Sequence, residues 1–125
     1  MPDLKFADPQ VAGELAEAEQ YPKVAKAAIK EMHRQEGDLV VGEDGIARRG
    51  LILRHLVLPG GLAGTEELME WVARELSPNT YVFVMDQYHP AHRAFRRPPL
   101  DRRLTREEYR AAIEAAHRAG LWRFA

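Results

Sequence analysis

Two charged residues near the amino terminus have the spacing of a ligand-facing pair. Asp3 and Lys5 are two positions apart, so in an extended strand both side chains point to one face, while Leu4 and Phe6 point to the other. On such a face the lysine can neutralise a ligand carboxylate, and the aspartate can bind a hydroxyl or an ammonium group. The same spacing suits a terminus with solvated charges, so the spacing leaves both interpretations open.

A second charged position interrupts the apolar run Leu51–Leu58. Arg54 lies within this run, and because its guanidinium is always protonated it requires an anionic partner there. That partner is either Asp3 or Asp86 of the same chain, or the carboxylate or phosphate of a ligand. His55 points to the opposite face, where we expect a core histidine whose hydrogen bonds are satisfied.

Asp86, His89 and His92 form a D-x-x-H-x-x-H run of metal-ligand residue types. A loop imposes no geometry on such a run, so we interpret the three residues as polar loop residues and predict no metal site. The glycines of Pro59–Gly64 precede a helix and could approach a phosphate. Because Glu66 and Glu67 would repel an anion there, we predict a simple turn.

The segment 93–106 contains six arginines and one aspartate, with Phe95 and two prolines between them. Such a segment could bind RNA or another polyanion, but no recognised nucleic-acid motif accompanies it. We favour a solvated loop that the acidic first helix partly neutralises, and we do not expect nucleic acid to be the partner.

The periodicity of the chain predicts the elements that must position these residues. Asp8 and Thr65 are expected to cap helices, and Thr105 with Glu108 has the pattern of a capping box. The predicted order is a short strand at 3–7, helices at 9–19 and 21–36, a hairpin of 38–41 with 46–48, a strand at 51–58, a helix at 65–76, a strand at 81–85, a polar loop to 104, and a helix at 105–119. Three βα units with an inserted hairpin imply an α/β fold with a parallel sheet, and ligand sites of such sheets lie beyond the carboxyl ends of the strands.

Composition limits the classes of protein that this chain can belong to. With 125 residues, 46% of them hydrophobic and 30% charged, residues 1–125 are expected to form one folded domain. The net charge of -1 provides no overall field that would recruit nucleic acid or an anionic membrane. The absence of cysteine excludes disulfides, thiolate nucleophiles and sulfur-ligated metals within this chain. With no apolar run long enough to span a membrane, we expect a cytoplasmic protein without a membrane partner.

Four segments together are similar to the second half of a known family. They are Pro2–Phe6, Ala28–Gln35 with Gly37, Arg49–Gly60, and Met85–Pro90. They resemble the radical S-adenosylmethionine proteins similar to pyruvate formate-lyase activating enzyme, over Asp3 to about Leu121. The resemblance implies a partial, half TIM-like barrel, in which this chain supplies the last three strands of a (β/α)6 barrel.

The resemblance also implies roles for the charged residues. Asp3, Lys5 and Arg54 would face the lumen near S-adenosylmethionine, and a substrate site at the barrel mouth would contain Asp86, Gln87 and Tyr88. The family holds a [4Fe-4S] cluster with a CxxxCxxC motif in its first half, and this chain has no cysteine. We therefore expect a fragment or split half that is not catalytic alone and has no catalytic residue of its own. A partner chain would have to supply the cluster cysteines.

The expected partner is a second copy or a complementary amino-terminal half, because the first strand and the lumen face would otherwise be exposed. Two alternatives stay open. The half barrel could be a non-redox module that binds a small carboxylate or a nucleoside, or the chain could be an RNA-associated protein that uses its arginine-rich segment.

Overall fold

Four α-helices and two small sheets make up the fold. The computed structural model describes residues 1–125. The α-helices are α1 (Pro9–Ala16), α2 (Tyr21–Glu36), α3 (Thr65–Glu75) and α4 (Arg106–Arg118); the strands are β1 (Val40–Val41), β2 (Ala47–Arg49), β3 (Ile52–Leu56) and β4 (Tyr81–Met85); two short 3-10 turns are η1 (Pro59–Gly61) and η2 (His92–Arg96). The fold is of the mixed α/β class, and its sheets do not close into a barrel. None of these helices combines the length and the apolar character needed to cross a bilayer.

The first helix begins as its sequence predicts and ends early. The Asp8 carboxylate accepts a hydrogen bond from the backbone N–H of Gln10 at 2.7 Å, as expected of an N-cap. The helix ends at Ala16, not near Glu19, because Glu17 adopts a left-handed backbone conformation with φ 54°.

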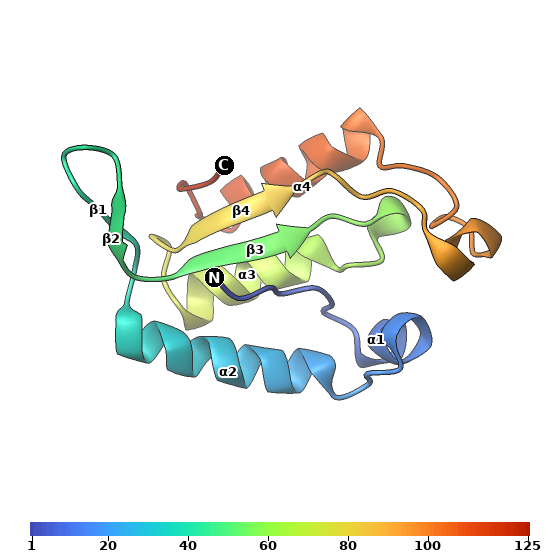
Figure 1. The fold of residues 1–125 in the computed structure, drawn as a ribbon, viewed down its shortest axis with the longest axis horizontal. Helices are drawn as coiled ribbons and strands as arrows, with labels where there is room; N and C mark the ends of the chain where they lie inside the picture. Colours follow the sequence, from blue (N-terminus) through green and yellow to red (C-terminus); the bar gives the residue numbers. More distant parts are fainter.

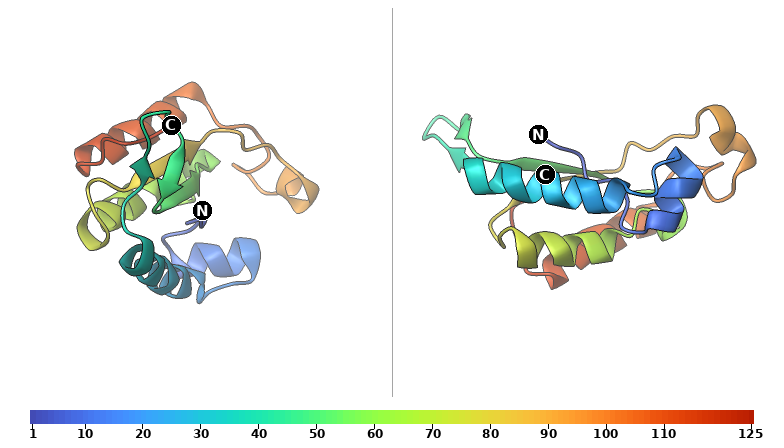
Figure 2. Two further views of the ribbon diagram at one scale, coloured as in Figure 1. Left: turned by 60° about the vertical axis from the view of Figure 1, so that its left-hand side comes forward. Right: turned by 90° about the horizontal axis from the view of Figure 1, so that it is seen from below.

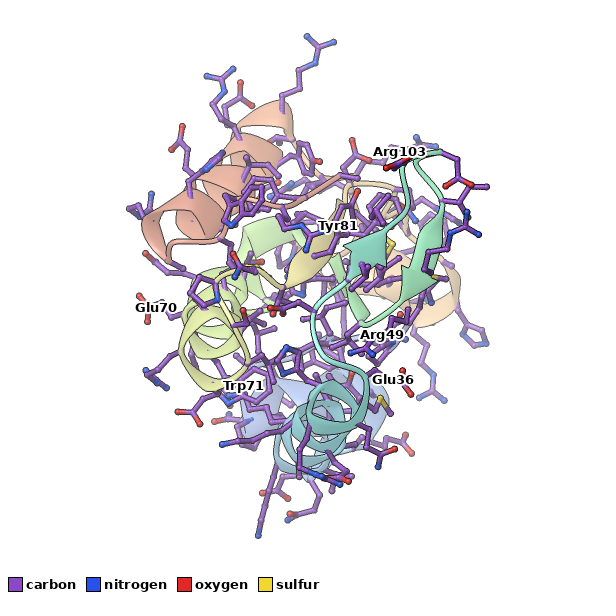
Figure 3. All side chains as sticks on the ribbon, turned by 90° about the vertical axis from the view of Figure 1, so that its left-hand side faces the viewer. Glu36, Arg49, Glu70, Trp71, Tyr81 and Arg103 are labelled. Atoms are coloured by element: carbon purple, nitrogen blue, oxygen red, sulfur yellow. The ribbon has the colours of Figure 1, made fainter.

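The second helix packs against the third through an aromatic residue. Trp71 of α3 lies between α3 and α2 (Figure 3), and the ammonium of Lys26 on α2 is 5.8 Å from its ring centroid. The salt bridge of Lys30 with Glu75, 2.8 Å long, joins the same two helices. These contacts fix α2 beside α3, and the predicted helix over 21–36 is confirmed.

Thr65 does not cap α3, which corrects the prediction. The N-cap is Gly64, in a left-handed conformation with φ 68°, and Thr65 is the first helical residue. The Thr65 hydroxyl is instead within 2.9 Å of Nε2 of His55. The Thr65 hydroxyl therefore hydrogen-bonds to the buried imidazole of β3 instead of capping the helix, as the local sequence predicts. The capping box of α4 is confirmed, since Thr105 and Glu108 hydrogen-bond to each other's backbone N–H.

The hairpin and the parallel strand pair are both confirmed. In the hairpin, β1 and β2 are antiparallel, and Val40 pairs with Arg49. β3 and β4 are parallel, Arg54 pairs with Phe83, and α3 connects the two strands. The predicted first strand is reduced to a single parallel bridge between Asp3 and Arg54.

A pairing that the sequence did not predict lies along the outer edge of β4. The carboxyl-terminal residues run parallel to this strand, with a bridge between Val82 and Phe124. The Val82 N–H donates to the Arg123 carbonyl at 2.9 Å, and the Val84 N–H donates to the Ala125 carbonyl at 3.2 Å. Residues 123–125 thus cover the edge that β4 would otherwise expose.

The helices α3 and α4 cover one face of the β3–β4 pair and leave the other face uncovered (Figures 1 and 2). The covered face carries the core, which includes Leu53, Val82 and Val84. On the uncovered face, Arg54 is partly exposed and Phe83 is 40% exposed. We call this surface, made by Ile52, Arg54, Leu56, Tyr81 and Phe83 together with Asp3, the bare face. The hairpin and the loop after β4 flank its two ends (Figure 2).

Candidate functional site

Three charged residues that the sequence singled out meet on the bare face. The bridge between Asp3 and Arg54 sets their side chains beside each other, and Arg54 Nε donates to Asp3 Oδ1 at 2.6 Å. Lys5 Nζ lies 3.7 Å from the other Asp3 carboxylate oxygen, Oδ2. Of the partners left open for Arg54, the structure selects Asp3. We call Asp3, Lys5 and Arg54 the ionic cluster.

The ionic cluster keeps capacity for an anion. Only Nε of the Arg54 guanidinium donates to Asp3, so both Nη groups have no hydrogen-bond partner in the protein. The two cations exceed the one carboxylate by a single positive charge. The Arg54 side chain is 40% exposed and that of Lys5 54% exposed, so a ligand can reach both. This arrangement fits a carboxylate or phosphate on the Arg54 Nη groups, with Asp3 available to an ammonium or hydroxyl nearby.

The second predicted group follows β4 at its carboxyl end. Asp86 and Gln87 are exposed, and the Gln87 amide nitrogen is 3.4 Å from the Met85 sulfur. The Tyr88 hydroxyl donates to the Leu100 carbonyl at 2.8 Å, which ties the loop back on itself. Burial, followed by the nearby Asp101 charge, raises the pKa of Tyr88, so this phenol stays protonated. Asp86 and Gln87 are exposed and can be reached by a ligand, whereas the Tyr88 hydroxyl is engaged within the loop.

The structure does not bring the two groups into contact. Arg54 pairs in register with Phe83, and Asp86 lies further along the same strand direction. At about 3.3 Å a residue, the offset from Phe83 to Asp86 is about 10 Å. A ligand that meets both groups must span at least about that length along the strand direction.

The sequence analysis did not single out Tyr109, which lies at the same end of β4. Its hydroxyl donates to the Val84 carbonyl at 3.2 Å, joining α4 to the end of the strand. Burial, followed by the Asp86 charge, raises the pKa of Tyr109. In the sequence, Tyr109 is recognisable only by its position one turn after the capping box of the last predicted helix. That position predicts a side chain that faces the core, but it does not predict the bond to Val84.

His55 is the predicted core histidine, and the prediction is confirmed. The residue is fully buried, with Nδ1 2.6 Å from the Leu4 carbonyl and Nε2 2.9 Å from the Thr65 hydroxyl. Because a carbonyl only accepts, we assign the proton to Nδ1, and Nε2 accepts from the threonine. Burial lowers the pKa of His55, and the hydrogen bond to Leu4 opposes this only in part.

The loop histidines do not converge. Asp86, His89 and His92 do not form a group that could hold a metal ion, and the structure has no such group of three histidine, aspartate or glutamate side chains elsewhere. His89 and His92 are both exposed.

The glycine turn before α3 is already engaged by an anion of the protein itself. The Gly60 N–H donates to Glu108 Oε1 at 2.8 Å. Arg102, followed by the backbone N–H groups of Gly60 and Thr105, holds the pKa of Glu108 well below its usual range. A cavity of about 810 Å³ adjoins this turn between α3 and α4, but Glu66, Glu67 and Glu70 line it. The predicted turn is thus confirmed, and its surroundings repel anions.

Two of the arginines of the segment 93–106 are tied to the protein. Arg102 forms a two-pronged contact with the Glu108 carboxylate at 2.9 Å for each bond. Arg97 donates to the backbone carbonyl of Glu14 at 2.8 Å, so the segment contacts α1 as expected. Arg97 bonds to a backbone carbonyl and not to a carboxylate of α1. The expectation that the acidic side chains of the first helix neutralise the arginines through direct ion pairs is therefore corrected.

Comparison with known proteins gives one distant match. The chain is 32% identical over 120 residues to a protein of Methanocaldococcus jannaschii named "Uncharacterized protein MJ0674". The alignment covers 95% of this chain and 31% of that protein, so the chain spans about a third of the relative's length. No family model matches the chain, and no solved structure matches it.

Proposed function

We propose that this chain is the carboxyl-terminal half of a radical S-adenosylmethionine protein similar to pyruvate formate-lyase activating enzyme. In this proposal residues 1–125 supply three βα units of a partial (β/α)6 barrel and are not catalytic alone. The observation that carries the proposal is the bare face. A parallel strand pair, extended by the Asp3 bridge, is covered by helices on one side and presents the ionic cluster on the other. A barrel has this arrangement, with helices outside and charged ligand-binding residues inside.

The length of the distant relative also supports the proposal that this chain is one part of a larger protein. About two thirds of the M. jannaschii protein lies outside the aligned region, so that protein is about three times as long as the part that matches this chain. In this proposal the other half is a separate chain or a further part of the same protein. A second copy of the chain is the alternative partner.

The residues of this chain fit S-adenosylmethionine but not the iron-sulfur cluster. The Arg54 Nη groups and Lys5 suit the carboxylate of its methionine part, and the Asp3 carboxylate suits its ammonium. With no cysteine, this chain has no ligand for a [4Fe-4S] cluster, so any cluster depends on the partner. Asp86 and Gln87, with Tyr88 holding their loop, would meet the substrate beyond the carboxyl end of β4.

The test begins with the gene next to this one. We expect an upstream reading frame that encodes CxxxCxxC, and we expect its product to co-purify with this chain when the two are co-expressed. The reconstituted pair should show the visible absorbance of an iron-sulfur cluster. A pair that does not form, or a genome without such a frame, would show the split-half proposal to be wrong.

A second candidate function rests on the free capacity of the ionic cluster. The chain alone would bind a small carboxylate or nucleoside without redox chemistry. Calorimetric titration with S-adenosylmethionine and with acetate separates the candidates, and Arg54→Ala should weaken any binding at least about tenfold, since a charged hydrogen-bond partner is lost. Arg110→Ala, an exposed arginine on α4, is the matched control and should bind like the unaltered chain. No heat with either compound rules out the stand-alone module.

A further inference from the structure

The amino-terminal segment, residues 2–5, hydrogen-bonds to β3 along one edge, and its other edge faces away from β3. The Leu4 N–H donates to the Arg54 carbonyl at 2.9 Å, and the Arg54 N–H donates to the Pro2 carbonyl at 2.9 Å. In an extended segment the neighbouring residues point their backbone groups the opposite way. The Asp3 carbonyl and the Lys5 N–H therefore face away from β3, where a further strand would pair.

A single tyrosine hydroxyl occupies this outer edge. The Lys5 N–H donates to the Tyr21 hydroxyl at 3.1 Å, and the hydroxyl donates to the Asp3 carbonyl at 2.9 Å. One residue of a neighbouring strand would do the same, accepting with its carbonyl and donating with its N–H. The Tyr21 ring also packs edge-on against Phe6, at 5.9 Å between centroids. The Tyr21 hydroxyl therefore makes the two hydrogen bonds that the backbone of one residue in a neighbouring strand would make.

The opposite edge of the sheet is closed differently. Along β4, residues 123–125 provide backbone pairing, and the Ala125 N–H also donates to the Val82 carbonyl at 3.4 Å. That edge is completed by a segment of the same chain. Only the outer edge of the amino-terminal segment is held by a side chain, and a side chain can swing away without unfolding a strand.

We infer that the edge formed by Asp3 and Lys5 is a docking edge for an extended segment of the complementary polypeptide, and that the Tyr21 hydroxyl fills it until that segment binds. This inference rests on the proposed function, because the occupant is a strand of the missing part. Main-chain hydrogen bonds at an exposed sheet edge are a general mode of peptide capture. A second copy is disfavoured, because two copies pairing here about a two-fold axis would run antiparallel and enlarge the bare face rather than cover it.

Tyr21→Phe isolates the hydroxyl while keeping the ring that packs on Phe6. In the chain alone we expect faster hydrogen exchange of the Lys5 amide by NMR, with little change elsewhere. Tyr109→Phe removes a comparable hydroxyl-to-carbonyl bond, at Val84, and is the matched control that leaves Lys5 exchange unchanged. Unchanged Lys5 exchange in Tyr21→Phe would overturn the inference.

The docking step is tested with short overlapping peptides that tile the part of the M. jannaschii protein outside the aligned region. We expect at least one peptide to bind and to protect the Lys5 amide. It should bind Tyr21→Phe about tenfold tighter than the unaltered chain, because no hydroxyl has to be displaced. No binding by any peptide overturns the docking inference. Equal affinity for both variants also overturns it.

The outcomes distinguish this inference from the proposed function. If the upstream product co-purifies with the chain while Tyr21→Phe changes neither affinity nor Lys5 exchange, the proposed function stands and the docking edge is wrong. If Tyr21→Phe dimerises without peptide and protects Lys5 in the dimer, the occupant is a second copy, and the inference is again wrong. If no upstream frame or pair exists, the proposed function itself fails.

Discussion

Individual side chains in this fold often serve a distant element rather than their neighbours in sequence. His55 is the clearest case, since its two ring nitrogens contact the Leu4 carbonyl and the Thr65 hydroxyl, in segments that precede and follow β3. Its type and position predicted a satisfied core histidine. Its partners could not be predicted, because the apolar pattern fixes only which face the ring occupies.

The buried imidazole makes stability depend on pH. Burial lowers the pKa of His55 in the folded state, so below about pH 6.5 the unfolded chain takes up a proton that the folded chain does not. Stability is therefore full at neutral pH and falls as the pH drops, by up to about 1.4 kcal/mol per pH unit.

We expect His55→Gln to lower the free energy of unfolding by about 2 kcal/mol at pH 7 and to flatten this pH dependence between pH 7 and 5. Urea titrations at several pH values measure both effects. His89→Gln, at an exposed position, is the control and should retain the slope of the unaltered chain. An unchanged slope in His55→Gln would contradict the assignment.

At the scale of elements, the amino-terminal end of α4 is joined to the turn before α3 and to the loop after β4. Glu108 closes the capping box of α4, accepts from Gly60 before α3, and binds Arg102 in the loop. The capping box could be predicted from the sequence because it is a local pattern. The contacts with Gly60 and Arg102 could not, since neither follows from residues three or four apart.

Glu108→Ala should therefore destabilise the fold more than Thr105→Ala does. We expect about 1 kcal/mol for the threonine and about 2 kcal/mol or more for the glutamate, which removes three sets of contacts. Because the folded-state pKa of Glu108 is lowered, its contribution is full above about pH 4.5 and declines as the pH falls further.

Thermal unfolding at pH 7 and pH 3 measures these differences. Glu107→Ala, in the same helical turn and exposed, should leave the melting temperature nearly unchanged. Equal losses for the glutamate and threonine variants would mean that the contacts to Gly60 and Arg102 contribute nothing.

Other elements show where sequence patterns stop being informative. The helices at 21–36 and 65–76, of which the second ends at Glu75 in the structure, the hairpin and the parallel pair were predicted from periodicity and from glycine and proline positions. The strand-like pairing of residues 123–125 was not, because it depends on backbone groups and shows no apolar alternation. The role of Tyr21 was missed for the same reason, since a hydroxyl that binds a strand edge leaves no periodic signal.

At the scale of the whole molecule, the bare face is the surface that the proposed partner would cover. It carries a partly exposed aromatic ring, Phe83, beside the ionic cluster. The residue types at this face could be predicted from strand alternation. That no helix covers it depends on how all four helices pack, which local patterns do not encode.

We expect the chain alone to self-associate through this face. Phe83→Lys should shift the species seen by size exclusion with light scattering toward monomer, because a charge replaces the exposed ring. Phe95→Lys changes an even more exposed phenylalanine, 64% exposed, in the loop after β4, and should leave association unchanged. A monomer at every concentration of the unaltered chain would contradict the expectation.

The pairing of residues 123–125 with β4 also bears on how copies can stack. Fibres grow when one molecule offers a free strand border on each of two opposite sides, so that addition never ends. Here residues 123–125 already pair with β4. A further strand on that side would have to pair with this three-residue segment rather than with β4 itself, so continued strand addition is disfavoured there.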